Sequence, residues 1–194
     1  MEIGDLLEDY PKTIRLKDGS EVVLRSMQPD DAECLHKFFC ALPDNERILI
    51  KHRVTDLGVI RGWCENINYD RNLPLLAMVG GQVVADGRLH CEIGGWKRHI
   101  GRVSVAVHPE YRSQGLARIL ISELISIAQH SGLEKLEAEL LADQKGARYI
   151  FGALGFTELL FLEKYVKDMQ AIDHDYILMG MEITTPEDLT HAGG

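Results

Sequence analysis

This chain of 194 residues has no long apolar run, no paired cysteine motif, no internal repeat and no excess of positive charge. No apolar stretch approaches the roughly 20 residues of a membrane-spanning helix. The acidic first residues do not have the pattern of a secretory signal peptide. We therefore expect a soluble, cytoplasmic protein with no membrane partner.

The cysteines are few and unpaired in pattern, with no C-x-x-C spacing among Cys34, Cys40, Cys64 and Cys91. A chain of this length buries a sizeable core without disulfide bonds, so we expect reduced thiols. The triplet at 173–175, Asp-His-Asp, has metal-ligating residue types. Adjacent residues of an extended chain point to opposite faces, and we expect no metal site there.

The charge balance is acidic, with 21 lysines and arginines against 30 aspartates and glutamates and a net charge of −9. Such a chain repels a nucleic-acid backbone, and we expect no nucleic-acid partner. Any anion-binding site must therefore be built locally.

The central stretch of the sequence reads as a strand, a glycine turn and a helix. Val103, Val105 and Val107 alternate with small residues, which predicts a strand that ends near His108. Helical spacing of apolar residues begins after Gly115 and continues to residue 130. The first amides of such a helix lack partners and lie at the positive end of its dipole. The junction therefore predicts an anion site.

Small and basic residues surround this junction. Gly115 leaves the backbone open to a bulky anion, and Ala117 is the next smallest choice. Arg112 and Arg118 add positive charge, and each charged contact to a phosphate is worth roughly 1.5–3 kcal/mol. A Walker loop does not fit, because Gly115 is followed by Leu116 and Ala117, and a dinucleotide loop does not fit, because it needs three glycines and this stretch has one.

The order of the remaining elements predicts one α+β domain over residues 1–194, with a core at about 21–183 and a loose tail at 186–194. Alternation and turn signals predict further strands at 13–17, 21–25, 73–79, 82–90, 135–140, 157–167 and 175–183. Helical spacing predicts further helices behind Pro29, at about 44–53, at about 56–67, and at 144–154 with Asp143 as its cap.

Two motifs resemble those of the GNAT superfamily of N-acetyltransferases. The first is Arg112-x-x-Gly115-x-Ala117 directly after the valine strand, and the second is Gln144-x-x-Ala147-x-x-x-Phe151-x-x-Leu-Gly-Phe. The front half also resembles bacterial protein-lysine acetyltransferases. The resemblance implies a mixed, mostly antiparallel sheet flanked by helices and splayed between its two central strands. It implies acetyl-CoA contacts at Val105, Val107, Arg112, Gln114, Gly115, Leu116, Ala117, Arg118, Gln144 and Phe151.

The implied reaction is direct attack of an amine on acetyl-CoA in a ternary complex, and the sequence departs from the family pattern at two catalytic positions. Phe151 stands where the family has a tyrosine that protonates the leaving thiolate. Arg102 stands where many relatives have a glutamate base. Tyr111 or Tyr165 are alternative proton donors, or the step proceeds without one.

Several residues remain as candidates for the base. Glu139 lies on the strand that lines the splay and is our first choice. Glu137, His90, Glu92 and His108 remain as alternatives. Cys91 as an acyl-carrying nucleophile has no activating partner at a visible spacing.

The same motifs also suit a protein that binds acyl-CoA without turning it over. In that alternative, the chain is a sensor or regulatory domain in which Phe151 and Arg102 have replaced the catalytic tyrosine and glutamate. The sequence identifies neither the amine acceptor nor the acyl chain, and it leaves a homodimer through the closing strands open.

Overall fold

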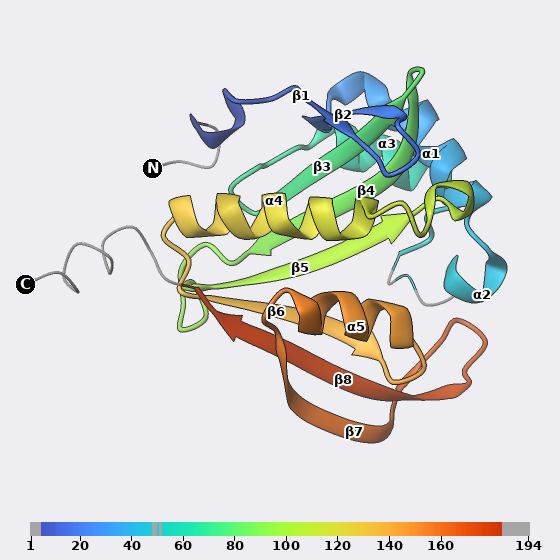
Figure 1. Cartoon of the computed structure of the whole chain (residues 1–194). Helices are drawn as coiled ribbons and strands as arrows, with labels where there is room; N and C mark the ends of the chain where they lie inside the picture. The colour runs from blue at the N-terminus through green and yellow to red at the C-terminus, as the bar shows by residue number, and fades with distance from the viewer. Residues whose placement is uncertain (1–4, 48–49, 51, 184–194) are drawn as a thin grey trace, which may run out of the picture.

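An open sheet of eight strands forms the centre of the computed structural model, which describes residues 5–47, 50 and 52–183 (Figure 1). The spatial order is β1-β2-β3-β4-β5-β6-β8-β7, and only the β5–β6 pair is parallel within this described part. The strands are β1 (Lys12–Arg15), β2 (Glu21–Ser26), β3 (Asn72–Val79), β4 (Gln82–Cys91), β5 (Ile100–Val107), β6 (Lys135–Leu141), β7 (Thr157–Lys167) and β8 (Asp173–Glu182).

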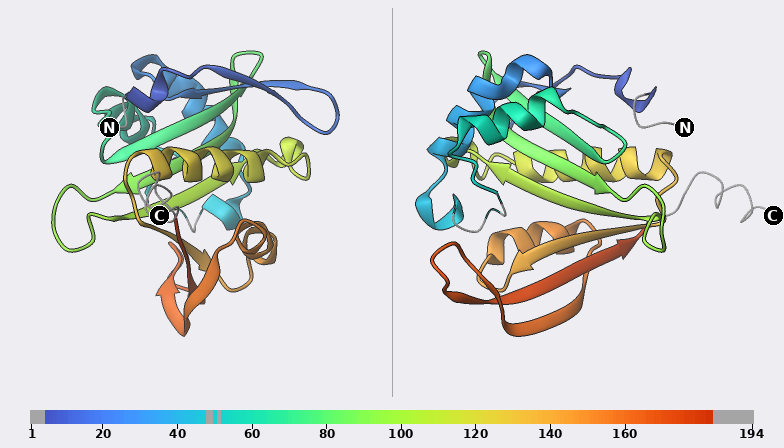
Figure 2. Two further views of the ribbon diagram at one scale, coloured as in Figure 1. Left: turned by 60° about the vertical axis from the view of Figure 1, so that its left-hand side comes forward. Right: turned by 180° about the vertical axis from the view of Figure 1, so that it is seen from behind.

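Helices cover both faces of the sheet. In Figure 1, α4 and α5 lie in front of the strands, and the reverse view in Figure 2 brings α1 and α3 forward. The α-helices are α1 (Ala32–Ala41), α2 (Asp44–Arg47), α3 (Leu57–Glu65), α4 (Leu116–His130) and α5 (Lys145–Ala153). Short 3-10 turns are η1 (Asp5–Leu7), η2 (Pro29–Asp31) and η3 (Pro109–Tyr111). The α+β architecture expected from the sequence is confirmed.

Alternation along β5 divides the core into two layers. Val103, Val105 and Val107 pack with α4 in the larger hydrophobic cluster. Ala106 faces the opposite side and packs with the cluster beneath α1 and α3. Side chains on this second face of β5 and β6 therefore lie on the side of the sheet opposite α4 and α5.

The two central strands diverge. Pairing of β5 with β6 stops at Arg102–Glu137, although β5 continues to Val107 and β6 to Leu141. In Figure 1 these strands meet at the left and separate toward the right, between α4 and α5. The closed end is tightly packed, because a Cβ on Gly101 would lie 2.8–2.9 Å from three leucine side chains. The predicted splay is confirmed.

Two predicted helix boundaries are wrong. The helix expected at about 44–53 is limited to Asp44–Arg47 among the described residues, and residues 50, 52 and 53 are not helical. The last helix begins at Lys145 with Gln144, not Asp143, as its N-cap. The side-chain oxygen of Gln144 instead accepts a hydrogen bond from the backbone N–H of Leu141, at 2.9 Å.

The expected tail at 186–194 lies outside the described residues. Within the described part of the chain, no helix combines the length and apolarity that crossing a membrane requires.

Candidate functional site

The N-terminus of α4 lies beside the wide end of the divergence between β5 and β6. Gly115 is the N-cap residue with φ +91°, a left-handed conformation that favours glycine, and it provides no side-chain cap. The helix starts with Leu116, whose buried side chain anchors the first turn in the core. The first amides of α4 have no acceptor within the helix, so this end of the helix can bind an anion.

The divergence leaves backbone groups of β5 without a strand partner. The N–H of His108 donates to the carbonyl of Val84 on β4 at 2.9 Å. Successive residues of a strand direct their N–H groups to opposite sides, so those of Val105 and Val107 point toward β6. Because β6 has separated from β5 at this level, these amides face the gap. An extended ligand can pair with them as an added strand would.

The two arginines of the predicted anion loop lie in different environments. The guanidinium of Arg112 forms a two-pronged ion pair with Glu46 of α2, with N–O distances of 2.7 and 2.8 Å. Its Nε also donates to the carbonyl of Val107 at 3.1 Å. Arg118 is exposed and has no ion pair to another described residue. The structure therefore places Arg112 against a carboxylate, whereas we expected it beside a bound phosphate.

The residues of the second motif lie on the α5 side of the divergence. Gln144 holds the Leu141 amide at the end of β6, as described above. Phe151 is fully buried, and its ring packs edge-on against Phe156 with 5.0 Å between centroids. Its ring is part of the core and has no hydroxyl to donate.

A group of polar side chains lies on the opposite face of the divergence. The guanidinium of Arg102 on β5 contacts the carboxylate of Glu139 on β6 at 3.2 Å. Tyr176 on β8 lies on the same face as Glu139, one diagonal step away in the pairing of β6 with β8. Burial, and then the negative charge of Glu139, raise the pKa of Tyr176 to about 12. Glu139 therefore lies between the guanidinium of Arg102 and the neutral hydroxyl of Tyr176.

Tyr176 was not among the residues that we selected from the sequence. Its position depends on the antiparallel register of β6 and β8, which pairs Leu141 with Tyr176 and Glu139 with Leu178. A signal was present, because Tyr176 lies in a predicted closing strand. The sequence alone does not show which strand it pairs with.

The other candidate bases lie in less suitable places. Glu137 is near Lys97 at 3.6 Å, and together with His90 and Glu92 it lines a cavity of about 210 Å³ at the closed end of the divergence, which Arg102 also lines. His108 accepts a hydrogen bond from the Glu110 amide, within the loop that follows β5.

The other two candidates from the sequence are Cys91 and the Asp-His-Asp triplet at 173–175. Burial raises the pKa of the Cys91 thiol to about 11, so the thiol is protonated at neutral pH. His174 of β8 hydrogen-bonds at 2.9 Å to the carboxylate of Asp168, which lies in the connection between β7 and β8.

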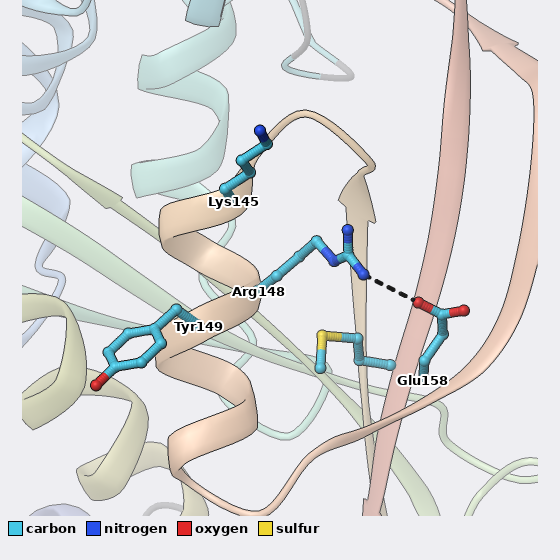
Figure 3. Close-up of a pocket in the computed structure, with 5 residues that line it drawn as sticks. Lys145, Arg148, Tyr149 and Glu158 are labelled. Carbon is cyan, nitrogen blue, oxygen red and sulfur yellow. Dashed lines mark hydrogen bonds and ion pairs between the residues drawn. The ribbon is translucent and has the colours of Figure 1, made fainter.

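A second cavity, of about 270 Å³, lies between α5 and the last strands (Figure 3). Arg148 points from α5 toward Glu158 of β7 and forms an ion pair with it at 3.2 Å, while Tyr149 points to the other side of the helix. None of the residues that line this cavity belongs to the group around Glu139.

Comparison with known proteins identifies relatives of the whole arrangement. Residues 36–156 match the family model described as acetyltransferase (GNAT) family. A curated relative, the ribosomal protein bS18 alanine N-acetyltransferase of Escherichia coli, is 31% identical over 81 residues, which are 42% of this chain and 54% of the relative. The match therefore spans about half the length of that relative.

Solved structures resemble the fold over most of the chain. The ribosomal-protein-alanine N-acetyltransferase of Brucella melitensis has a TM-score of 0.70 at 24% identity, covering 82% of this chain and 99% of that one. A Salmonella typhimurium structure that contains its cofactor acetyl-CoA has a TM-score of 0.72 at 20% identity, covering 85% and 95%. At these identities the structural similarity establishes the fold.

Proposed function

Because the chain belongs to the acetyltransferase (GNAT) family, we propose that it transfers an acetyl group from acetyl-CoA to a primary amine. One observation carries this proposal: β5 and β6 separate after Arg102–Glu137, next to the uncapped N-terminus of α4. An anion site and a strand-like slot are therefore adjacent. Acetyl-CoA has a diphosphate and an extended amide-bearing arm, which match these two features.

Backbone groups make most of the proposed cofactor contacts. The amides of residues 115–118 hold the diphosphate, and the exposed side chain of Arg118 adds charge. Gln114 lies partly exposed in the same loop. The gap-facing backbone of Val105 and Val107 pairs with the extended arm. The side-chain NH₂ of Gln144, whose oxygen is bound to Leu141, donates to the same arm.

The proposed chemistry takes place on the face of the divergence that carries Glu139. The neutral amine attacks the thioester carbonyl, the new C–N bond forms and the C–S bond breaks. Glu139 takes the proton that the attacking nitrogen loses, and Arg102 and Tyr176 hold its carboxylate in position. A backbone N–H near Val107 stabilises the oxyanion that develops on the carbonyl.

We propose an N-terminal α-amine as the acceptor to test first, because two proteins that this chain resembles are named for acetylating a ribosomal-protein alanine. The carboxylates of Glu137 and Glu139 lie on the acceptor side and attract a cationic amine. The test is release of free thiol from acetyl-CoA in the presence of a peptide with N-terminal alanine, a lysine peptide with a blocked N-terminus, or a polyamine.

A sensor that binds acetyl-CoA without turnover is the second candidate, and the buried Phe151 favours it because the family's proton donor is missing there. Calorimetry separates the two functions. Binding of acetyl-CoA together with thiol release supports the transferase, and binding with no release for any of the three acceptors supports the sensor. Absence of binding contradicts both.

The ion pair between Glu46 and Arg112 leads to a prediction about affinity. We propose that the diphosphate competes with Glu46 for Arg112, since both partners of this pair are more than a third exposed. Such a pair contributes at most about 1 kcal/mol. Glu46→Gln should therefore strengthen acetyl-CoA binding about two- to fivefold, measured by calorimetry at low salt.

A matched variant tests whether the effect of Glu46→Gln is local. Glu33→Gln removes the same charge from the exposed Glu33–Arg61 pair on the same side of the sheet, away from the loop. It should leave the affinity for acetyl-CoA unchanged. Weaker binding by Glu46→Gln would instead mean that the pair supports the cofactor site and that Arg112 does not exchange partners.

A further inference from the structure

We propose that the hydroxyl of Tyr176 delivers the proton to the departing coenzyme A thiolate, in place of the hydroxyl missing at residue 151. This inference rests on the proposed acetyl transfer. It concerns a residue on β8, whereas the donor implied by the family resemblance belongs to α5. The proposal is carried by the position of Tyr176 and by the contacts of the other tyrosines.

Tyr176 lies on β8, beside the end of β6 that has separated from β5, and on the same face as Glu139. It pairs across strands with Leu141, the residue whose amide is bound by Gln144. Glu139 and Tyr176 are diagonal neighbours on one face of the paired strands, so the hydroxyl of Tyr176 is within reach of the Glu139 carboxylate, and Glu139 in turn contacts Arg102 on β5 at 3.2 Å. The three side chains therefore form a continuous polar path across the divergence, from β8 to β5. A sulfur atom held in this gap lies beside that path.

The other five tyrosines of the chain have different surroundings. Tyr10 donates to Glu123 on α4, and Tyr69 donates to the carbonyl of Met27. The ring of Tyr111 packs against His108 in the loop after β5. Tyr149 and Tyr165 are 78% and 65% exposed. The ring of Tyr165 on β7 lies 5.7 Å from that of Tyr176, and among the six tyrosines, all within the described residues, Tyr176 is the one on the strand that pairs directly with the strand of Glu139.

The proton count balances along this path. The attacking nitrogen gives one proton to the carboxylate of Glu139 as the C–N bond forms. The C–S bond breaks, and the sulfur takes the proton of the Tyr176 hydroxyl together with the electron pair of that bond. Glu139 then returns its proton to the phenolate, so both side chains end in their starting states. Because the pKa of Tyr176 is raised, its hydroxyl is still protonated at the pH where the amine is neutral.

The decisive measurement requires no acceptor, because the product coenzyme A is used as the probe. A hydrogen bond from Tyr176 stabilises the bound thiolate, and the ultraviolet absorbance of the thiolate reports its fraction at each pH. In Tyr176→Phe the thiolate fraction at a fixed pH should fall about tenfold, the change expected from one charge-assisted hydrogen bond. With the N-terminal alanine peptide, the same variant should lose about 10²-fold in kcat.

Two further variants separate a proton donor from a structural residue. Tyr165→Phe removes the hydroxyl of the ring that packs against Tyr176, with 5.7 Å between centroids and a tilt of 50°, and it should change neither value. Phe151→Tyr combined with Tyr176→Phe should restore part of the thiolate fraction, because it supplies a hydroxyl from α5. Equal thiolate fractions in the wild-type and Tyr176→Phe complexes would overturn the role of Tyr176. Absence of any coenzyme A complex would overturn the acetyl-transfer proposal itself, and this inference with it.

Discussion

Replacing Gly115 by glutamate should weaken acetyl-CoA binding by at least about 100-fold, measured by calorimetry. The residue has φ +91°, so any side chain there is strained. The new carboxylate would also stand at the N-terminus of α4, where the proposed diphosphate binds. Loss of two or more charged contacts, each worth roughly 1.5–3 kcal/mol, accounts for the expected size of the effect.

Gly132 provides the matched control at the other end of the same helix. It has φ +80°, and a Cβ at this position would meet no heavy atom within 4 Å, so Gly132→Glu introduces the same strain and the same charge. It should lower stability to a similar degree and leave the affinity for acetyl-CoA unchanged. Normal binding by Gly115→Glu, or equal losses in both variants, would show that the diphosphate does not bind at this helix end.

The fold was predictable where local signals and the global arrangement agree. Alternating valines set the strand at 103–107, and Gly115 set the start of α4 to within one residue. The helix expected at about 44–53 was overestimated because helical spacing there is not supported by burial: no residue of α2 is buried. Most of the stability of a short helix comes from packing against the rest of the protein, and sequence periodicity does not show whether such packing exists.

The candidate site was predictable only in its backbone part. The helix N-terminus and the open strand edge follow from the order of elements, and both were expected from the sequence. The partners of Arg112 and Glu139 were not, because Glu46 is 66 residues from Arg112 and Arg102 is 37 residues from Glu139. Such contacts depend on how distant elements pack, and charge pattern alone does not determine them.

The ion pair between Arg102 and Glu139 bears on the position of the base, because Arg102 replaces the glutamate that the family has on this strand. A carboxylate at residue 102 would project from β5 on the face where the amine is proposed to approach. In this chain the carboxylate comes from β6, and Arg102 reaches across the divergence to hold it at 3.2 Å. We infer that the base has moved to the neighbouring strand while staying on the same face of the sheet.

This interpretation predicts that Glu139→Gln lowers kcat for the N-terminal alanine peptide about 10²- to 10³-fold. The amide keeps the shape of the side chain and can still accept hydrogen bonds from Arg102 and Tyr176, but it cannot take a proton. The KM for acetyl-CoA should change little, since Glu139 is not among the residues proposed to contact the cofactor. Thiol release under saturating acetyl-CoA measures the effect.

Glu137→Gln is the appropriate comparison, because it removes a carboxylate two residues away on the same face, near Lys97. It should change kcat less than about threefold, because an exposed charge pair contributes little free energy. Raising the pH supplies neutral amine from solution, so the rate of Glu139→Gln should increase with pH more steeply than that of the wild type. A wild-type kcat in Glu139→Gln would place the base elsewhere. An unchanged pH profile with a low kcat would assign Glu139 to holding the site together, because only a lost base is compensated by deprotonated amine from the solvent.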